Sequence, residues 1–412
     1  MSKIIKRGNL KKLAFYYLVI KLVISGLDYV LGSNYFSIPS LEYKTGSDFS
    51  LNDLHYKLDS STRDVKRFEN LILVNSGSLN QATFRLELAQ LVDSIKQADA
   101  KVIALDIDFS NDTTKPGTCE LLNQLNNTSS IVLAERFRND SGKLRAKKAV
   151  YGGVMFPEEQ FTIRRYGAGD TTFAYKIAKA YGADVTNFDK LSKNFVLNYT
   201  AHDYFQLDLK SANPIADYTF SQHPDNTIPM IDGAALLSND SLEISNVKQI
   251  LKGKIVLIGH LGNSCLDDLK NDLEDKHPAP CDHMLINRQK SMPGVLIHAN
   301  AVENMINPKS QFTVVSDNIF FIVFEELLLI LYLCFLLFVK AGKVINIMLM
   351  LALSLPALYV VLLLMNYNIY IEMGTTLLQL LVFEELAELI EPLYAKFERF
   401  KFRFTKLKFI RK

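Results

Sequence analysis

Four hydrophobic segments constrain this chain more than any other feature of its sequence, because they bracket one large polar region. The segments are residues 13–31, 318–339, 344–365 and 369–390. Each is close to the ~20 residues that cross ~30 Å of hydrocarbon at 1.5 Å per residue. The first segment lacks the small-residue cleavage site of a signal peptide, so it reads as an uncleaved anchor. The sequence therefore predicts four transmembrane α-helices, with residues 32–317 forming one domain on one side of a membrane.

The distribution of lysine and arginine predicts the orientation. Basic residues cluster in residues 1–12, in the turn at 340–343 and in the tail at 391–412. Basic residues near the ends of spans mark the cytoplasmic side, and four spans place all three clusters there. We therefore expect a multi-pass protein of the bacterial cytoplasmic (inner) membrane, with both termini in the cytoplasm and the large domain in the periplasm.

The net charge of the chain argues against a nucleic-acid-binding protein and excludes no other class. The whole chain carries a formal net charge of only +2, so no basic surface for nucleic acid is predicted. In the tail, apolar residues recur at steps of three and four between basic ones, which suits a helix lying on anionic lipids. Two other interpretations stay open: the basic residues only set the orientation, or the helix docks on a partner.

The polar region reads as an α/β domain with a mostly parallel sheet. Short apolar runs predict buried strands, and runs with helical periodicity lie between them. The predicted strands are residues 71–75, 102–109, 131–134, 195–199 and 255–259, and the predicted helices are 81–97, 119–125 and 294–305. The glycine-rich stretch at 151–170 is expected to be an insertion or a hairpin. A strand, a helix and a second strand imply a right-handed parallel crossover.

Three segments of this region resemble the CHASE2 domain family. They are KVIALDIDF at 101–109, GKIVLIG at 253–259 and MPGVLIHANA at 292–301. The layout of one hydrophobic segment, a large domain and three closing segments is also similar to that family. The resemblance implies an extracytoplasmic sensory module, of the kind that is usually joined to a histidine kinase, a nucleotide or diguanylate cyclase, or a serine/threonine kinase.

Two functions are expected from this reading, and neither is enzymatic. The tail after the last segment is too short for a kinase or cyclase, so a sensor of this kind acts through a separate protein. The alternative is a structural or accessory subunit of an envelope complex, for export or envelope assembly, that senses no ligand. No nucleophile elbow, Walker loop or dinucleotide-binding glycine motif occurs, so no catalytic residue and no cofactor is predicted. The expected partners are membrane lipids and other inner-membrane or periplasmic proteins.

Candidate ligand-binding residues follow the predicted strands. Asp106 and Asp108 come at the end of a parallel strand, where open α/β sheets usually bind ligands. Two carboxylates at i and i+2 could hold a cation, or one of them could instead cap the following turn. His298 lies in the first turn of a helix, either as a ligand-binding residue or as a hydrogen-bonded structural one.

Cysteine and histidine gather in one later segment. Cys265 and Cys281 are candidates for a disulfide, because the segment is expected outside the cytoplasm. Free thiols and a metal site stay open as alternatives, although the spacing with His277 and His283 matches no common zinc motif, so no metal is predicted. By the resemblance, Asp268 and His277 are further candidates for the ligand edge of the sheet.

Ionisable residues inside the hydrophobic segments predict an internal contact. Lys21 lies in the first segment, and Glu384 and Glu385 lie in the last. Charges in hydrocarbon are costly and usually paired, so we expect an ion pair between Lys21 and one of these glutamates. The alternative is that Lys21 extends to the membrane surface.

Overall fold

The computed structural model divides the chain into two compact units. Unit 1 consists of Met1–Leu58 and Thr313–Lys412, and unit 2 of Asp59–Phe312. The residues that the structure describes are 7–31, 55–56, 68–109, 114–135, 144–154, 156, 162–191, 194–211, 227–237, 241–261, 276–277, 279–280, 292–315, 319–339, 343–371 and 386–397.

Unit 2 is built on a seven-stranded sheet in which every pair of neighbouring strands is parallel. The strands are β1 (Leu71–Asn75), β2 (Val102–Leu105), β3 (Ile131–Glu135), β4 (Val150–Gly153), β7 (Asp203–Gln206), β8 (Thr227–Asp232) and β9 (Ile255–Gly259). Their order across the sheet is β4-β3-β2-β9-β1-β8-β7. The predicted α/β fold with a mostly parallel sheet is thus confirmed.

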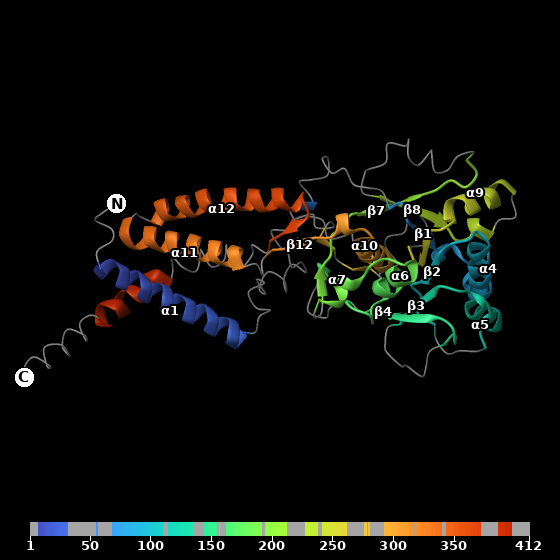
Figure 1. Ribbon diagram of the computed structural model, residues 1–412, viewed down its shortest axis with the longest axis horizontal. Coiled ribbons are helices and arrows are strands. Elements are labelled where there is room, and N and C mark those ends of the chain that lie inside the picture. The colour runs from blue at the N-terminus through green and yellow to red at the C-terminus, as the bar shows by residue number, and fades with distance from the viewer. Residues whose placement is uncertain are drawn as a thin grey trace, which may run out of the picture. The chain divides into compact units, whose positions relative to one another are not determined.

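Helices cover both faces of this sheet, which explains why its strands are almost continuously apolar. The helices α4 (Phe84–Gln97), α5 (Thr118–Asn127) and α9 (Ser241–Leu251) pack with the η4 turn (Ala235–Leu237) on one face. The helices α6 (Phe173–Tyr181) and α10 (Gly294–Ile306) pack together on the other (Figure 1). Alternation along β2 sends Ile103 and Leu105 toward α4 and α5, and therefore Ala104 toward α6 and α10.

Smaller elements complete unit 2. They are the turns η2 (Ser76–Ser78), η3 (Gln81–Thr83) and η6 (Pro308–Ser310), the helix α7 (Thr186–Asp189), and the short strands β5 (Arg165–Gly167), β6 (Asn194–Val196), β10 (Lys276–His277) and β11 (Met292–Pro293). β5 pairs with β6, and β10 with β11, in two antiparallel ribbons.

Two expectations about unit 2 were wrong. The apolar run at 195–199 was predicted as a strand of the main sheet, but it forms only β6, which pairs with β5. The stretch at 151–170 was predicted as an insertion or hairpin, yet its first residues belong to β4, which extends the main sheet beside β3. Gly152 in β4 is needed for packing rather than for a turn. A Cβ at this position would lie 2.5 Å from the Cα of Phe173, so only glycine lets α6 approach the strand this closely.

Unit 1 contains three long helices, α1 (Arg7–Leu31), α11 (Ile319–Val339) and α12 (Lys343–Met365), and a further helix at 386–397. The helices α1, α11 and 386–397 share one buried cluster, formed by Tyr16, Ile20, Leu329, Tyr332, Leu333, Ala387 and Ile390. The strands β12 (Thr313–Val314) and β13 (Ile369–Tyr370) pair in parallel beside the end of α12.

The predicted membrane spans are not confirmed. None of the helices, over the part of the chain that the structure describes, combines the length and the apolar character that crossing a membrane requires. The predicted fourth segment begins at β13 rather than in a helix. Glu384 and Glu385, within that segment, lie outside the described residues.

Candidate functional site

The order of the strands creates a switch point at the carboxyl edge of the main sheet. β2 leads into α5 on one face, whereas its neighbour β9 leads through β11 into α10 on the opposite face. The chain therefore leaves these two adjacent strands in opposite directions, and ligand crevices of open α/β sheets form at such points. Asp106 follows β2 here, and its backbone N–H donates to the carbonyl of Ile258 at 2.8 Å.

The structure brings together two of the predicted site residues at this point, Asp106 and His298. The His298 Nε2 atom lies 3.9 Å from Asp106 Oδ2, and the two side chains are only 3% and 11% exposed. This separation is longer than a direct hydrogen bond. The two side chains form an ion pair only when the imidazole is protonated. The pair joins the end of β2 to the second turn of α10, which the sequence spacing alone did not reveal.

Tyr166 on β5 forms a hydrogen bond with the other ring nitrogen of His298. Its hydroxyl lies 2.6 Å from His298 Nδ1. Burial raises the pKa of Tyr166 above its usual range, so the phenol stays protonated, while the backbone of Ala174 also hydrogen-bonds to it. With Ala174 N–H donating to the phenol oxygen, the phenol proton is free to donate to Nδ1. A neutral His298 then carries its proton on Nε2, facing the Asp106 carboxylate.

Aromatic rings enclose His298. The Phe156 ring stacks on the imidazole with centroids 5.1 Å apart, and Phe173 of α6 meets it edge-on at 5.4 Å. His277, a further predicted site residue, contacts this group through Phe156, with the two ring centroids 4.8 Å apart. We call Asp106, Tyr166, Phe156, Phe173 and His298 the histidine box. Sequence reasoning missed the three aromatic members, because Phe156 lies in a segment after β4, Tyr166 in β5 and Phe173 in α6, and their contacts with His298 depend on tertiary packing.

Asp108 has different neighbours from Asp106. It lines a small pocket of about 10 Å³ together with Phe109, Leu133, Ala134, Glu135, Leu144, Arg145 and Tyr151. A volume of this size holds about one water molecule. The strand β2 ends at Leu105, so the strand alternation that would align Asp108 with Asp106 does not continue this far.

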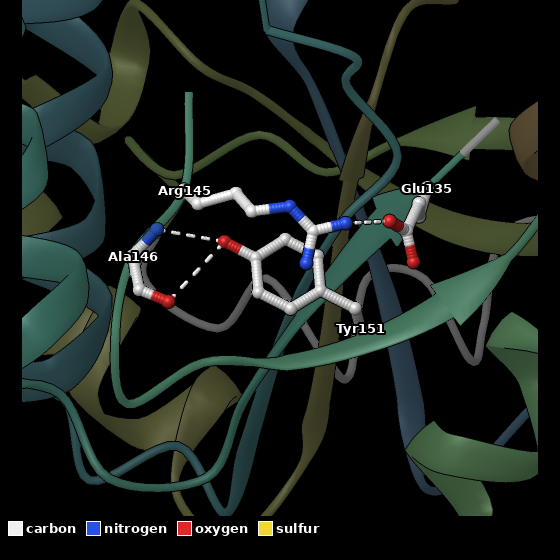
Figure 2. A network of polar contacts seen from close by, with 4 residues as sticks. All are labelled: Glu135, Arg145, Ala146 and Tyr151. Atoms are coloured by element: carbon white, nitrogen blue, oxygen red, sulfur yellow. Dashed lines mark hydrogen bonds and ion pairs between the residues drawn. The ribbon is translucent and has the colours of Figure 1, made fainter. Parts of the chain in front are cut away.

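A polar network forms the wall of that pocket beside β3 and β4 (Figure 2). The Arg145 guanidinium pairs with Glu135 and lies over the Tyr151 ring, 4.9 Å from its centre. The Tyr151 hydroxyl in turn accepts from the N–H of Ala146 at 2.7 Å. Since Arg145 is already neutralised by Glu135, the network fixes this edge of the sheet rather than leaving a cation available.

The remaining candidates fall outside what the structure describes. Asp268, Cys265, Cys281 and His283 all lie outside the described residues, so the disulfide stays a prediction. Among the described residues, no group of three histidine, cysteine or acidic side chains is placed to hold a metal ion.

Lys21 is paired, but with a residue that the sequence did not single out as its partner. Its ammonium lies 2.5 Å from Glu326 Oε1 of α11, and the Tyr17 hydroxyl donates to Oε2 of the same carboxylate. The predicted partners Glu384 and Glu385 are not described. The helix α1 and the helix at 386–397 are joined by another pair, in which Lys12 lies 3.6 Å from Glu391.

Comparison with known protein families identifies one family for this chain. The model of the CHASE2 domain family matches residues 47–341, more than half of the chain. Comparison with curated proteins and with solved structures gives no match. CHASE2 domains are sensory domains, and the histidine box is formed by two of the three segments, 101–109 and 292–301, that resemble the family, together with Phe156, Tyr166 and Phe173. The chain therefore belongs to the CHASE2 domain family.

Proposed function

We propose that this protein is a sensor of the bacterial cytoplasmic membrane, whose CHASE2 domain binds a ligand or partner outside the cytoplasm and acts through a separate protein. The observation that carries the proposal is the histidine box at the switch point of a parallel sheet. It places an acidic and a basic side chain, both almost completely buried, on two elements whose separation a bound group can change.

The helix α10 provides a route from this box toward unit 1. His298 lies near its start, every residue from Gly294 to Met305 is buried, and the chain enters α11 at Ile319. A helix packed on all sides cannot absorb a displacement by bending freely, so a shift at His298 moves its other end as well. The same helix therefore connects recognition at the sheet with the segment that precedes α11.

Membrane attachment is supported by surface composition and by charge. Large apolar side chains are exposed along α11 and α12, among them Leu327, Leu331 and Met348, each more than half exposed. Large exposed apolar side chains that gather on the same helices support contact with lipid or with another protein. The ion pair of Lys12 with Glu391 and the stacking of Phe15 on Phe397 bring the basic N-terminus and the start of the basic tail to the same end of unit 1, as the predicted orientation requires.

The test is purification of the full chain in mild detergent at native expression, followed by identification of stoichiometric partners. We expect a signalling enzyme such as a kinase or cyclase, whose activity changes when Asp106→Asn removes the charge that faces His298. The matched control is Asp203→Asn, an exposed residue at the start of β7. Recovery of export or assembly subunits alone, or an effector that does not respond to Asp106→Asn, contradicts the sensor and favours the structural subunit.

Exchanging the charges of the α1–α11 ion pair tests how unit 1 is held together. Lys21→Glu places two carboxylates side by side at partly buried positions, and we expect it to lower stability by about 1–3 kcal/mol. Adding Glu326→Lys restores an attractive pair, so the double variant should regain most of that loss. Thermal unfolding of the full chain in one detergent measures both effects.

The two candidate partners of Lys21 can be distinguished in the same experiment. In the Lys21→Glu background, Glu384→Lys is the matched control, because Glu384 is the partner that the sequence predicted. Rescue by Glu384→Lys but not by Glu326→Lys would refute the pairing seen in the structure.

A further inference from the structure

Glu303 is a buried carboxyl group that the histidine box does not use. It lies on α10, well after His298, and only 4% of its surface is exposed. Its Oε1 atom accepts from Nδ2 of Asn307 at 3.0 Å, whereas its buried Oε2 atom has no hydrogen-bond partner among the residues that the structure describes. A buried carboxylate with an unpaired oxygen is costly, because it has lost water and gained only one hydrogen bond in return.

The same residue closes the end of α10. Its carbonyl accepts from the N–H of Asn307 at 2.9 Å and from the Ser310 hydroxyl at 3.0 Å. The N–H of Ser310 then donates to the carbonyl of Asn307 at 2.9 Å, which forms the η6 turn. We call residues 307–312 the exit segment, because they lead from α10 to the end of unit 2 at Phe312. Glu303 therefore contacts this segment through both its side chain and its backbone.

The charged and titratable groups around Glu303 do not stabilise its ionised form. Burial raises the pKa of Glu303, the hydrogen bond from Asn307 lowers it, and Glu69 before β1 raises it further. Tyr181 at the end of α6 faces the same carboxyl, and both burial and Glu303 raise the pKa of Tyr181. Lys101 packs its ammonium on the Tyr181 ring, 4.2 Å from the centre, and Lys309 on η6 is exposed.

We propose that Glu303 is a proton-controlled latch, whose neutral form holds the exit segment against the end of α10 and whose ionised form releases it. This input is a proton at the end of α10, distinct from the ligand or partner that binds at the histidine box. The proposal does not depend on that ligand, so either one can fail while the other stands.

The direction of the pH effect follows from linkage. The closed form binds the proton more tightly than a form in which Glu303 has reached water, so the closed form is favoured at low pH. As the pH rises from the ordinary carboxyl pKa through the raised one, the latch loses stability. Each unit of difference between the two pKa values changes the opening constant about tenfold.

Hydrogen exchange of the full chain in detergent tests the latch, with protection factors used to remove the intrinsic pH dependence of exchange. The reporters are the amides of Asn307 and Ser310, whose hydrogen bonds form the turn. In the wild type, we expect their protection to be lower at pH ~8 than at pH ~5. In Glu303→Gln, which stays neutral, it should be independent of pH.

Two further variants make the result decisive. Glu69→Gln changes an exposed side chain and removes a charge that raises the Glu303 pKa. The protection of both amides at alkaline pH should therefore be higher in this variant than in the wild type. Glu120→Gln, an exposed change on α5, should leave the wild-type profile unaltered. Flat protection in the wild type, or an equal pH dependence in Glu303→Gln, would overturn the latch.

Discussion

Asn300→Ala is expected to lower the free energy of unfolding by about 3–5 kcal/mol, one of the two largest effects that we predict. Asn300 is fully buried on α10, and its Oδ1 accepts from the N–H groups of Thr200 and Ala201, both at 2.9 Å. Its Nδ2 donates to the carbonyls of Ala201 and Leu296. The alanine variant removes the partners of the buried N–H and carbonyl of Ala201 and of the partly buried N–H of Thr200, and it also leaves a small cavity.

Chemical denaturation followed by tyrosine fluorescence measures this loss, since the chain has 18 tyrosines and no tryptophan. The matched control is Asn123→Ala on α5, where the side chain is exposed and the expected change is within about 0.5 kcal/mol. An Asn300→Ala variant as stable as the control would mean that α10 does not clamp the 200–201 segment as the structure shows.

His298→Phe is expected to cost about 2–4 kcal/mol, although it keeps an aromatic ring in the box. The loss arises because the buried Tyr166 hydroxyl, 2.6 Å from Nδ1 in the wild type, is left without its acceptor. Adding Tyr166→Phe removes that hydroxyl, so the double variant should be less destabilised than the sum of the single variants, by about 1–2 kcal/mol.

The same denaturation measurement on the wild type, both single variants and the double variant gives the coupling energy directly. Additive effects, with no coupling between positions 166 and 298, would contradict a hydrogen bond from Tyr166 to His298. The comparison also separates structure from sensing, because a folded double variant keeps the rings of the box but has no titratable imidazole facing Asp106.

The strands that the sequence predicted correctly are those whose burial is continuous. Residues 71–75 and 255–259 became β1 and β9 without change, because strands covered on both faces consist of apolar residues that no other element would place together. The strand β8 was missed, since Pro229 interrupts its pattern and proline is unusual inside a sheet. The short strand β7, with polar residues at both ends, gave no signal either.

The sequence likewise predicted some residues of the candidate site and missed others. The sequence identified Asp106 from its position after a parallel strand and His298 from its position in a helix. It gave no sign that Tyr166, 132 positions away from His298, would hold the imidazole. It also suggested one shared role for Asp106 and Asp108, whereas the structure gives them different neighbours because β2 ends before either residue.

By itself, the sequence determined the class of fold, the CHASE2 family and the order of the principal elements, because these depend on local apolar periodicity and on short motifs. Tertiary structure alone decided which polar side chains meet: Asp106 with His298, Tyr166 with His298, and Lys21 with Glu326. Such pairs join residues up to hundreds of positions apart, and their distances depend on how helices pack against a sheet or against one another. No local pattern carries that information, because packing is settled by the shape and burial of the whole unit.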